Sequence, residues 1–162
     1  LISATAYDSK YTGSDGVLRN TSYNGTYIAN FLGGKEFRLN ARQSISIGGK
    51  VTAAGGKRYG YVNSAQSNLL NEVIFIDSAF NDRQFKDYFR ADLKINWKLN
   101  SEKVTHEIGL DLVNILNTKN LLSLTYAPNL TDPSQEPTAE KTQLGFLPIF
   151  YYRIDFKVAG RK

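Results

Sequence analysis

The most regular feature of the chain is an alternation of apolar and polar residues between positions 88 and 100. The apolar positions are Phe89, Ala91, Leu93, Ile95, Trp97 and Leu99, and the polar ones are Arg90, Asp92, Lys94, Asn96, Lys98 and Asn100. A period of two predicts a β-strand with one apolar and one polar face. The segment is longer than the usual strand of about 5–6 residues in soluble domains. It fits a tilted transmembrane strand of about 9–11 residues.

The same alternation recurs elsewhere in the chain. Residues 37–51 place Phe37, Leu39, Ala41, Ile45, Ile47 and Val51 opposite Arg38, Asn40, Arg42, Ser44, Ser46 and Lys50. Near the end, the even positions of residues 144–158 form a further apolar row. These patterns predict six strands at roughly 1–9, 17–32, 36–53, 88–99, 103–117 and 143–158. Pro148 lacks an amide proton, so we expect it at a bulge or at a locally unpaired position.

Connections of two kinds alternate between these strands. We predict tight turns at residues 32–36 and 100–103, and long loops at 54–87 and 118–142 that are rich in Asn, Ser, Thr, Gly and Pro. A structureless loop of more than about 15 residues argues against a compact soluble domain. Short turns at one end and long loops at the other are typical of outer-membrane β-barrels. If the short turns are periplasmic, then Phe31, Phe37, Trp97, Tyr152 and Phe156 should lie near the inner rim.

Composition and charge narrow the classes of function. The 162 residues contain no cysteine, no methionine and one histidine, His106, which leaves little for metal or imidazole chemistry. The net charge of +5 comes from dispersed Lys and Arg residues, so we expect a solvated polar face and no nucleic-acid partner. No run of about 20 apolar residues predicts a transmembrane helix. The chain opens in mid-strand without an initiator Met, and we interpret it as a fragment or a processed piece.

Several stretches together resemble one protein family. They are residues 24–27, 33–37, 54–59, 87–95 and 106–120, followed by 145–148 and 152–156. The ordered set of Asp111-Leu112-x-Asn114-x-x-Asn117, then Asn120, Pro148 and a terminal aromatic strand carries most of the likeness. The chain thereby resembles the C-terminal barrel region of TonB-dependent outer-membrane receptors, especially the large type with an N-terminal carboxypeptidase-regulatory-like domain.

The resemblance implies an all-β, antiparallel up-and-down transmembrane β-barrel of 22 strands, of which this chain supplies about six C-terminal ones. It implies a non-enzymatic wall segment that takes part in active import of a scarce nutrient (a glycan, a peptide or a metal chelate), with no cofactor. The implied partners are outer-membrane lipid, the rest of the barrel and its plug, TonB through the N-terminal part, the barrel assembly machinery and, in some relatives, a surface lipoprotein lid.

Candidate site residues follow from the two faces and the loops, and none is catalytic, metal-binding or cofactor-binding. Lumen-facing or plug-facing candidates are Arg38, Arg42, Arg90, Asp92, Lys94 and Asp111, and we expect ion pairs among them across strands. Lipid-facing candidates are Phe89, Leu93, Ile95, Trp97, Phe150 and Ile154. Candidates for contacts made by the extracellular loops are Tyr59, Tyr61, Phe75, Phe80 and Phe85, with simple loop packing as an equal alternative. By resemblance, Tyr152, Ile154 and Phe156 form the assembly signal.

Some interpretations stay open at this point. We expect Asn114, Asn117 and Asn120 to satisfy backbone groups where a strand ends, with substrate contact as the second interpretation, and His106 to be structural. The whole chain could instead belong to a passive porin or an adhesin barrel. A soluble β-sandwich binding module is the third alternative, and burial of Leu93, Ile95 and Trp97 inside protein would support it.

Overall fold

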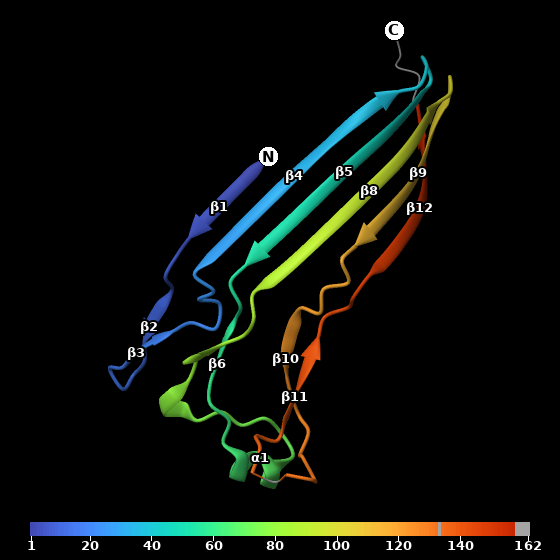
Figure 1. Ribbon diagram of the computed structural model, residues 1–162. Coiled ribbons are helices and arrows are strands. Elements are labelled where there is room, and N and C mark those ends of the chain that lie inside the picture. The colour runs from blue at the N-terminus through green and yellow to red at the C-terminus, as the bar shows by residue number, and fades with distance from the viewer. Residues whose placement is uncertain (133, 158–162) are drawn as a thin grey trace.

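An antiparallel six-stranded sheet dominates the computed structural model, which describes residues 1–132 and 134–157 (Figure 1). Its strands, in spatial order, are β1 (Ile2–Ala6), β4 (Tyr27–Arg38), β5 (Gln43–Ala54), β8 (Tyr88–Asn100), β9 (Val104–Val113) and β12 (Leu147–Phe156). Each strand pairs with the next one in chain order, as in an up-and-down meander. The predicted all-β antiparallel class is therefore confirmed. The sheet is open, and β1 and β12 are its edges.

Smaller elements occupy the long connections. They are β2 (Lys10–Thr12), β3 (Leu18–Asn20), β6 (Arg58–Tyr59), α1 (Ser64–Leu70), the 3₁₀ turn η1 (Asp77–Ala79), β7 (Arg83–Gln84), β10 (Leu121–Tyr126) and β11 (Thr138–Thr142). The helix α1 starts after Asn63, whose side chain accepts a hydrogen bond from the Gln66 amide. All these elements lie beyond one end of the long strands, and the short turns lie at the other end (Figure 1). Thus the predicted long loops are present, but they are folded.

The register of the strands combines the alternating patterns into two faces. One row of paired residues crosses five strands, with each residue directly opposite the next: Phe37 (β4), Ile45 (β5), Trp97 (β8), Ile108 (β9) and Tyr152 (β12). Residues that are directly opposite point to the same side of a sheet. All predicted lipid-facing residues therefore share one face, here called the apolar face. The residues between them form the polar face.

The prediction of one strand at 17–32, followed by a turn at 32–36, is wrong. Residues 18–20 pair with β2, whereas β4 begins at Tyr27 and runs on through Gly33 and Gly34 to Arg38. The two glycines lie opposite Gly49 and Gly48, and a Cβ at Gly34 would lie 3.0 Å from the Ile47 carbonyl oxygen. This glycine pair therefore permits close approach of backbones and does not form a turn.

The β4–β5 turn lies instead at residues 39–42, inside the predicted strand 36–53. The Leu39 and Asn40 amides donate to the Gln43 carbonyl, and the Arg42 amide donates to the Asn40 side chain at 2.9 Å. This side-chain contact to the backbone two residues on is the usual reason that Asn starts a turn. The turn predicted at residues 100–103 is confirmed to within one residue: β8 runs through Asn100, and the Ser101 amide donates to the Val104 carbonyl.

Other boundaries are corrected by smaller amounts. Three strands are shorter than predicted: β1, β9 and β12 cover only parts of the predicted ranges 1–9, 103–117 and 143–158. Position 158 lies outside the described residues. Pro148 lies opposite Leu112 in register within the edge strand β12, and not at a bulge. Phe31 is paired with Val51, six positions before Phe37. It therefore lies about 20 Å from the rim where we expected it.

The sheet has almost no interior. Among the described residues, the buried apolar side chains are few, namely Val62, Ala91 and Pro137. The solvent-accessible surface is 11339 Å², whereas a compact monomer of this mass exposes about 8,100 Å². In the part of the chain that the structure describes, no helix is long and apolar enough to cross a membrane.

Candidate functional site

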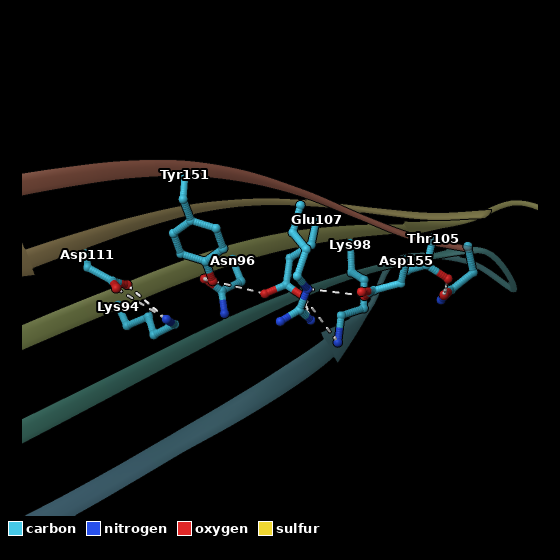
Figure 2. A network of polar contacts seen from close by, with 10 residues as sticks. Lys94, Asn96, Lys98, Thr105, Glu107, Asp111, Tyr151 and Asp155 are labelled. Carbon is cyan, nitrogen blue, oxygen red and sulfur yellow. Dashed lines mark hydrogen bonds and ion pairs between the residues drawn. The ribbon is translucent and has the colours of Figure 1, made fainter. Parts of the chain in front are cut away.

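The polar face carries a row of charged groups across β8, β9 and β12 (Figure 2). Its centre is Glu107, whose side chain is 6% exposed. Arg153 Nη2 donates to Glu107 Oε2 at 2.7 Å, and Lys98 Nζ lies 3.7 Å from the same oxygen. These three residues lie directly opposite one another in the sheet. The alternation thus places a buried carboxylate between two cations.

Tyr151 supports this carboxylate from the edge strand. Its hydroxyl lies 2.9 Å from Glu107 Oε1 and 3.0 Å from Asn96 Oδ1. A phenol has one proton, so it donates to one oxygen at a time, and the bond to a charged carboxylate is the stronger. The ring lies over Gly109, its register partner, where a Cβ would come 2.2 Å from two ring atoms. An aromatic ring that covers a cross-strand glycine is a known stabilising device of sheets.

Two further pairs extend the polar face toward the loops. Lys94 Nζ lies 3.1 Å from Asp111 Oδ1 across β8 and β9. Arg90 holds Asp92 with two hydrogen bonds of 2.8 and 3.0 Å along β8. The other oxygen of Asp92 accepts the Asn114 amide at 2.9 Å. The expected cross-strand ion pair is therefore confirmed for Asp111, whereas Asp92 pairs with Arg90 along the same strand.

Five of the six lumen-facing candidates, namely Arg38, Arg90, Asp92, Lys94 and Asp111, lie on the polar face. Arg42 does not, because it falls in the 39–42 turn and not in a strand. Glu107, Arg153, Tyr151 and Gly109 were missed. Their alternate spacing in the two strands predicts the polar face for each of them, but it does not single out the buried Glu107.

The opposite face is apolar and open. The lipid-facing candidates Phe89, Leu93, Ile95, Trp97, Phe150 and Ile154 all lie on it, together with the assembly-signal candidates Tyr152 and Phe156. Phe150 is 70% exposed and Phe156 is 77% exposed. His106 lies on the same face and is hydrogen-bonded through Nδ1 to the Tyr152 hydroxyl at 2.7 Å. Within residues 1–132 and 134–157, no group of three or more acidic, His or Cys side chains could hold a metal ion.

Asparagine side chains form hydrogen bonds with backbone groups at the loop end of the strands, where no neighbouring strand does so. Asn120 accepts from the Phe89 amide and donates to the Phe89 carbonyl, both at 2.9 Å, where β9 has already ended. Asn117 accepts the Phe146 amide at 3.0 Å. Asn114 bonds to the Thr118 amide and carbonyl. The expectation that these residues satisfy backbone groups is confirmed.

The aromatic loop candidates pack on one another. Tyr59 and Phe85 stack with ring centroids 4.1 Å apart, and Phe75 and Phe80 meet edge to face at 6.3 Å. Arg83 lies over the Tyr61 ring at 4.4 Å. The same guanidinium donates to both Glu136 oxygens at 2.8 Å, which ties the loop at 54–87 to the one at 118–142. Loop packing is therefore what the geometry shows for most of them.

The tip of the β2–β3 hairpin carries the most strongly shifted acid. Arg19 donates two hydrogen bonds to the Asp15 carboxylate, at 2.7 and 3.0 Å, and the Val17 amide donates a third. These bonds to the charged form lower the pKa of Asp15 from its usual value to about 2. The pair orders an exposed turn outside the large sheet.

A cavity of about 260 Å³ lies where the strands meet the loops. Its lining includes Tyr7, Tyr23, Lys57, Lys86 and Tyr88. Gly55 lines the cavity, and a Cβ on Gly55 would overlap the Gly25 carbonyl. Two backbones thus pack directly on each other at this point. Phe85 also lines the cavity. It is the one lining residue that the sequence analysis named as a candidate for a functional contact.

Comparisons of the chain with protein-family models, with curated proteins and with solved structures find no match.

Proposed function

We propose that the six-stranded sheet is part of the wall of a transmembrane β-barrel in the outer membrane of a bacterium. The observation that carries this proposal is the register, which aligns the alternating patterns of neighbouring strands into one continuous apolar face. In the described part of the chain, no second sheet or helix covers that face. A soluble β-sandwich would bury the same residues between two sheets. Lipid is the solvent that suits an uncovered apolar face.

The dimensions support a membrane-spanning sheet. The apolar row of β8 runs from Phe89 to Leu99, which spans about 34 Å at about 3.4 Å per residue. A strand tilt of about 40° reduces this to about 26 Å along the membrane normal, close to the apolar band of about 25 Å in such barrels. The short turns at residues 39–42 and 101–103 would then face the periplasm. The folded long loops would face the outside.

The open edges call for more strands. An unpaired strand edge in hydrocarbon leaves backbone groups without partners, at several kcal/mol each. β1 and β12 therefore need partners from the rest of the same barrel. The count of 22 strands comes from the family resemblance alone.

The family resemblance gives the barrel its function: a TonB-dependent receptor that actively imports a scarce nutrient. The Glu107 and Asp111 ion pairs then fix the lumen wall or hold a plug domain. A passive porin or an adhesin barrel is the second candidate, since its wall would show the same two faces. A plug domain encoded upstream in the same gene supports the receptor, whereas a gene without one supports the porin.

Paired arginine substitutions test the assignment of the faces. Leu93→Arg lies near the middle of the apolar row and should cost about 2–4 kcal/mol in lipid. The folded yield in outer membranes of cells that express the full-length protein should fall accordingly. Asn96→Arg, on the polar face of the same strand, is the matched control and should leave most of the yield intact. Equal yields for the two variants would contradict the proposal.

A further inference from the structure

The cavity at the loop end of the strands, here called the mouth pocket, combines aromatic faces with positive charge. Tyr7, Tyr23, Phe85 and Tyr88 supply rings to its lining. Its volume of about 260 Å³ is just below the range of about 300–1,000 Å³ that is typical of pockets for drug-sized ligands. It therefore fits a small molecule with a single ring.

The charge of the mouth pocket is one-sided. Lys57 and Lys86 both line it, and no lining residue carries a carboxylate. Within the described residues, neither lysine has an ion-pair partner within 4.0 Å, while Lys57 Nζ lies 4.9 Å from the centre of the Tyr23 ring. The neighbouring carboxylate, Asp87, already accepts bonds from the Tyr27 hydroxyl at 2.7 Å and the Gly56 amide at 3.3 Å.

The backbone around the mouth pocket is fixed. A Cβ on Gly56 would lie 2.0 Å from the Phe85 carbonyl oxygen, and the short strand β7 is held there by the bond from Gln84 Nε2 to the Gly56 carbonyl at 3.1 Å. Ala54 and Tyr88 face each other on the polar side of β5 and β8. The pocket is thus preformed, and its lining residues Ala54 and Tyr88 place it at the loop end of the face that the proposed function assigns to the lumen.

We propose that the mouth pocket binds a small organic anion that carries a ring. The acidic group pairs with Lys57 and Lys86, and the ring packs on a tyrosine face. The role of this site as an entry point for cargo rests on the proposed function, whereas the binding itself does not. A sugar acid and an aromatic acid share the required chemistry.

Binding to the purified full-length protein in detergent tests the proposal by calorimetry. The probes are glucuronate, glucose and benzoate, because glucuronate differs from glucose in its carboxylate and benzoate has an aromatic ring. We expect saturable binding of at least one anion, weakened by salt, and none of glucose. Binding of glucuronate alone identifies a sugar ring, and binding of benzoate alone an aromatic one.

Lysine variants locate the site. Lys57→Gln and Lys86→Gln should each raise the Kd of the bound anion about tenfold, which corresponds to about 1.4 kcal/mol. Lys103→Gln removes the same charge at the opposite end of the sheet and should leave the Kd unchanged. Retained mobility of the unheated, folded form on electrophoresis shows that the variants fold.

Three results would overturn the proposal: no saturable binding of either anion, equal binding of glucose and glucuronate, or unchanged Kd in both lysine variants. If no anion binds, but Asn96→Arg inserts normally and Leu93→Arg does not, then the pocket proposal is wrong and the barrel proposal stands. If the anion binds as expected, but the two arginine variants give equal folded yields, then the barrel proposal is wrong and the pocket proposal stands.

Discussion

Substitution of Gly109 by alanine tests the packing of the polar face. The new Cβ would lie 2.2 Å from Cε1 and Cζ of the Tyr151 ring, where ordinary contact begins at 3.4 Å. The ring must therefore retreat by more than 1 Å. Its hydroxyl, now 2.9 Å from Glu107 Oε1, then loses that hydrogen bond.

The magnitude follows from two opposing terms. A lost hydrogen bond to a charged group costs about 1.5–3 kcal/mol. Replacing glycine by alanine in a strand returns about 0.5–1 kcal/mol of backbone entropy. We therefore expect Gly109→Ala to lower the free energy of unfolding by about 0.5–2.5 kcal/mol. Urea unfolding of the full-length protein in detergent micelles, followed by the mobility of the unheated form on electrophoresis, measures it.

Gly48→Ala is the matched control on the same face. A Cβ there would meet only the Gly33 carbonyl oxygen, at an ordinary 3.7 Å, so this variant should be neutral or slightly more stable. In a Tyr151→Ala background the clash is absent, and Gly109→Ala should then behave like Gly48→Ala. A double-mutant cycle gives this coupling directly. If Gly109→Ala is as harmless as Gly48→Ala, or if its effect persists without the Tyr151 ring, the reasoning is wrong.

Two other predictions concern the loop end of the molecule. Asn120→Ala leaves the Phe89 amide and carbonyl without their side-chain partner and should cost about 1–3 kcal/mol for each of these groups that water does not reach. The amide of Phe89 should then exchange its hydrogen faster, and an unchanged exchange rate would contradict this role of Asn120. For Asp15, the folded pKa of about 2 is below the unfolded value of about 3.9. Its contribution to stability is therefore complete above about pH 5 and is lost progressively as the pH falls through 2. Carboxyl ¹³C NMR of the Arg19→Gln variant should show the pKa of Asp15 raised toward 3.9, and an unshifted pKa would remove the guanidinium as its cause.

Alternation fixed the faces of the strands but not where one strand ends. The period-two pattern of residues 88–100 predicted β8 to within one residue, because each side chain in it faces either polar groups or an apolar surface. Gly33 and Gly34 misled the prediction, since glycine serves both in turns and at close backbone contacts. Only the register with Gly48 and Gly49 distinguishes the two uses.

The contacts of the candidate site depend on cross-strand register. Lys94 and Asp111 are 17 residues apart, and their pairing requires the alignment of β8 with β9. Glu107 was missed because it lies among polar-face residues that look equally solvated in the sequence. Glu107 is buried by Arg153 and Tyr151 on β12. The lengths of the turns and loops do not predict the register that brings these two residues to Glu107.

The polar loops show a similar limit. Composition predicted that residues 54–87 form a long loop, but it did not predict that Arg83 would reach Glu136 in another loop. Contacts between loops depend on shapes that have no short-range pattern in the sequence. The mouth pocket is lined by several such segments, so the sequence did not predict it for the same reason.

Cysteine scanning along β8 distinguishes an apolar face that meets lipid from one that is packed inside protein. The 162 residues contain no native cysteine. Single cysteines at positions 89–99 therefore carry the spin label in the full-length protein in lipid vesicles, after any cysteine elsewhere in that protein has been replaced. We expect odd positions to be accessible to oxygen dissolved in lipid and even positions to a water-soluble nickel chelate; position 91 is left out of the comparison, because Ala91 is buried. Odd positions shielded from both reagents, as in a packed protein interior, would contradict this expectation.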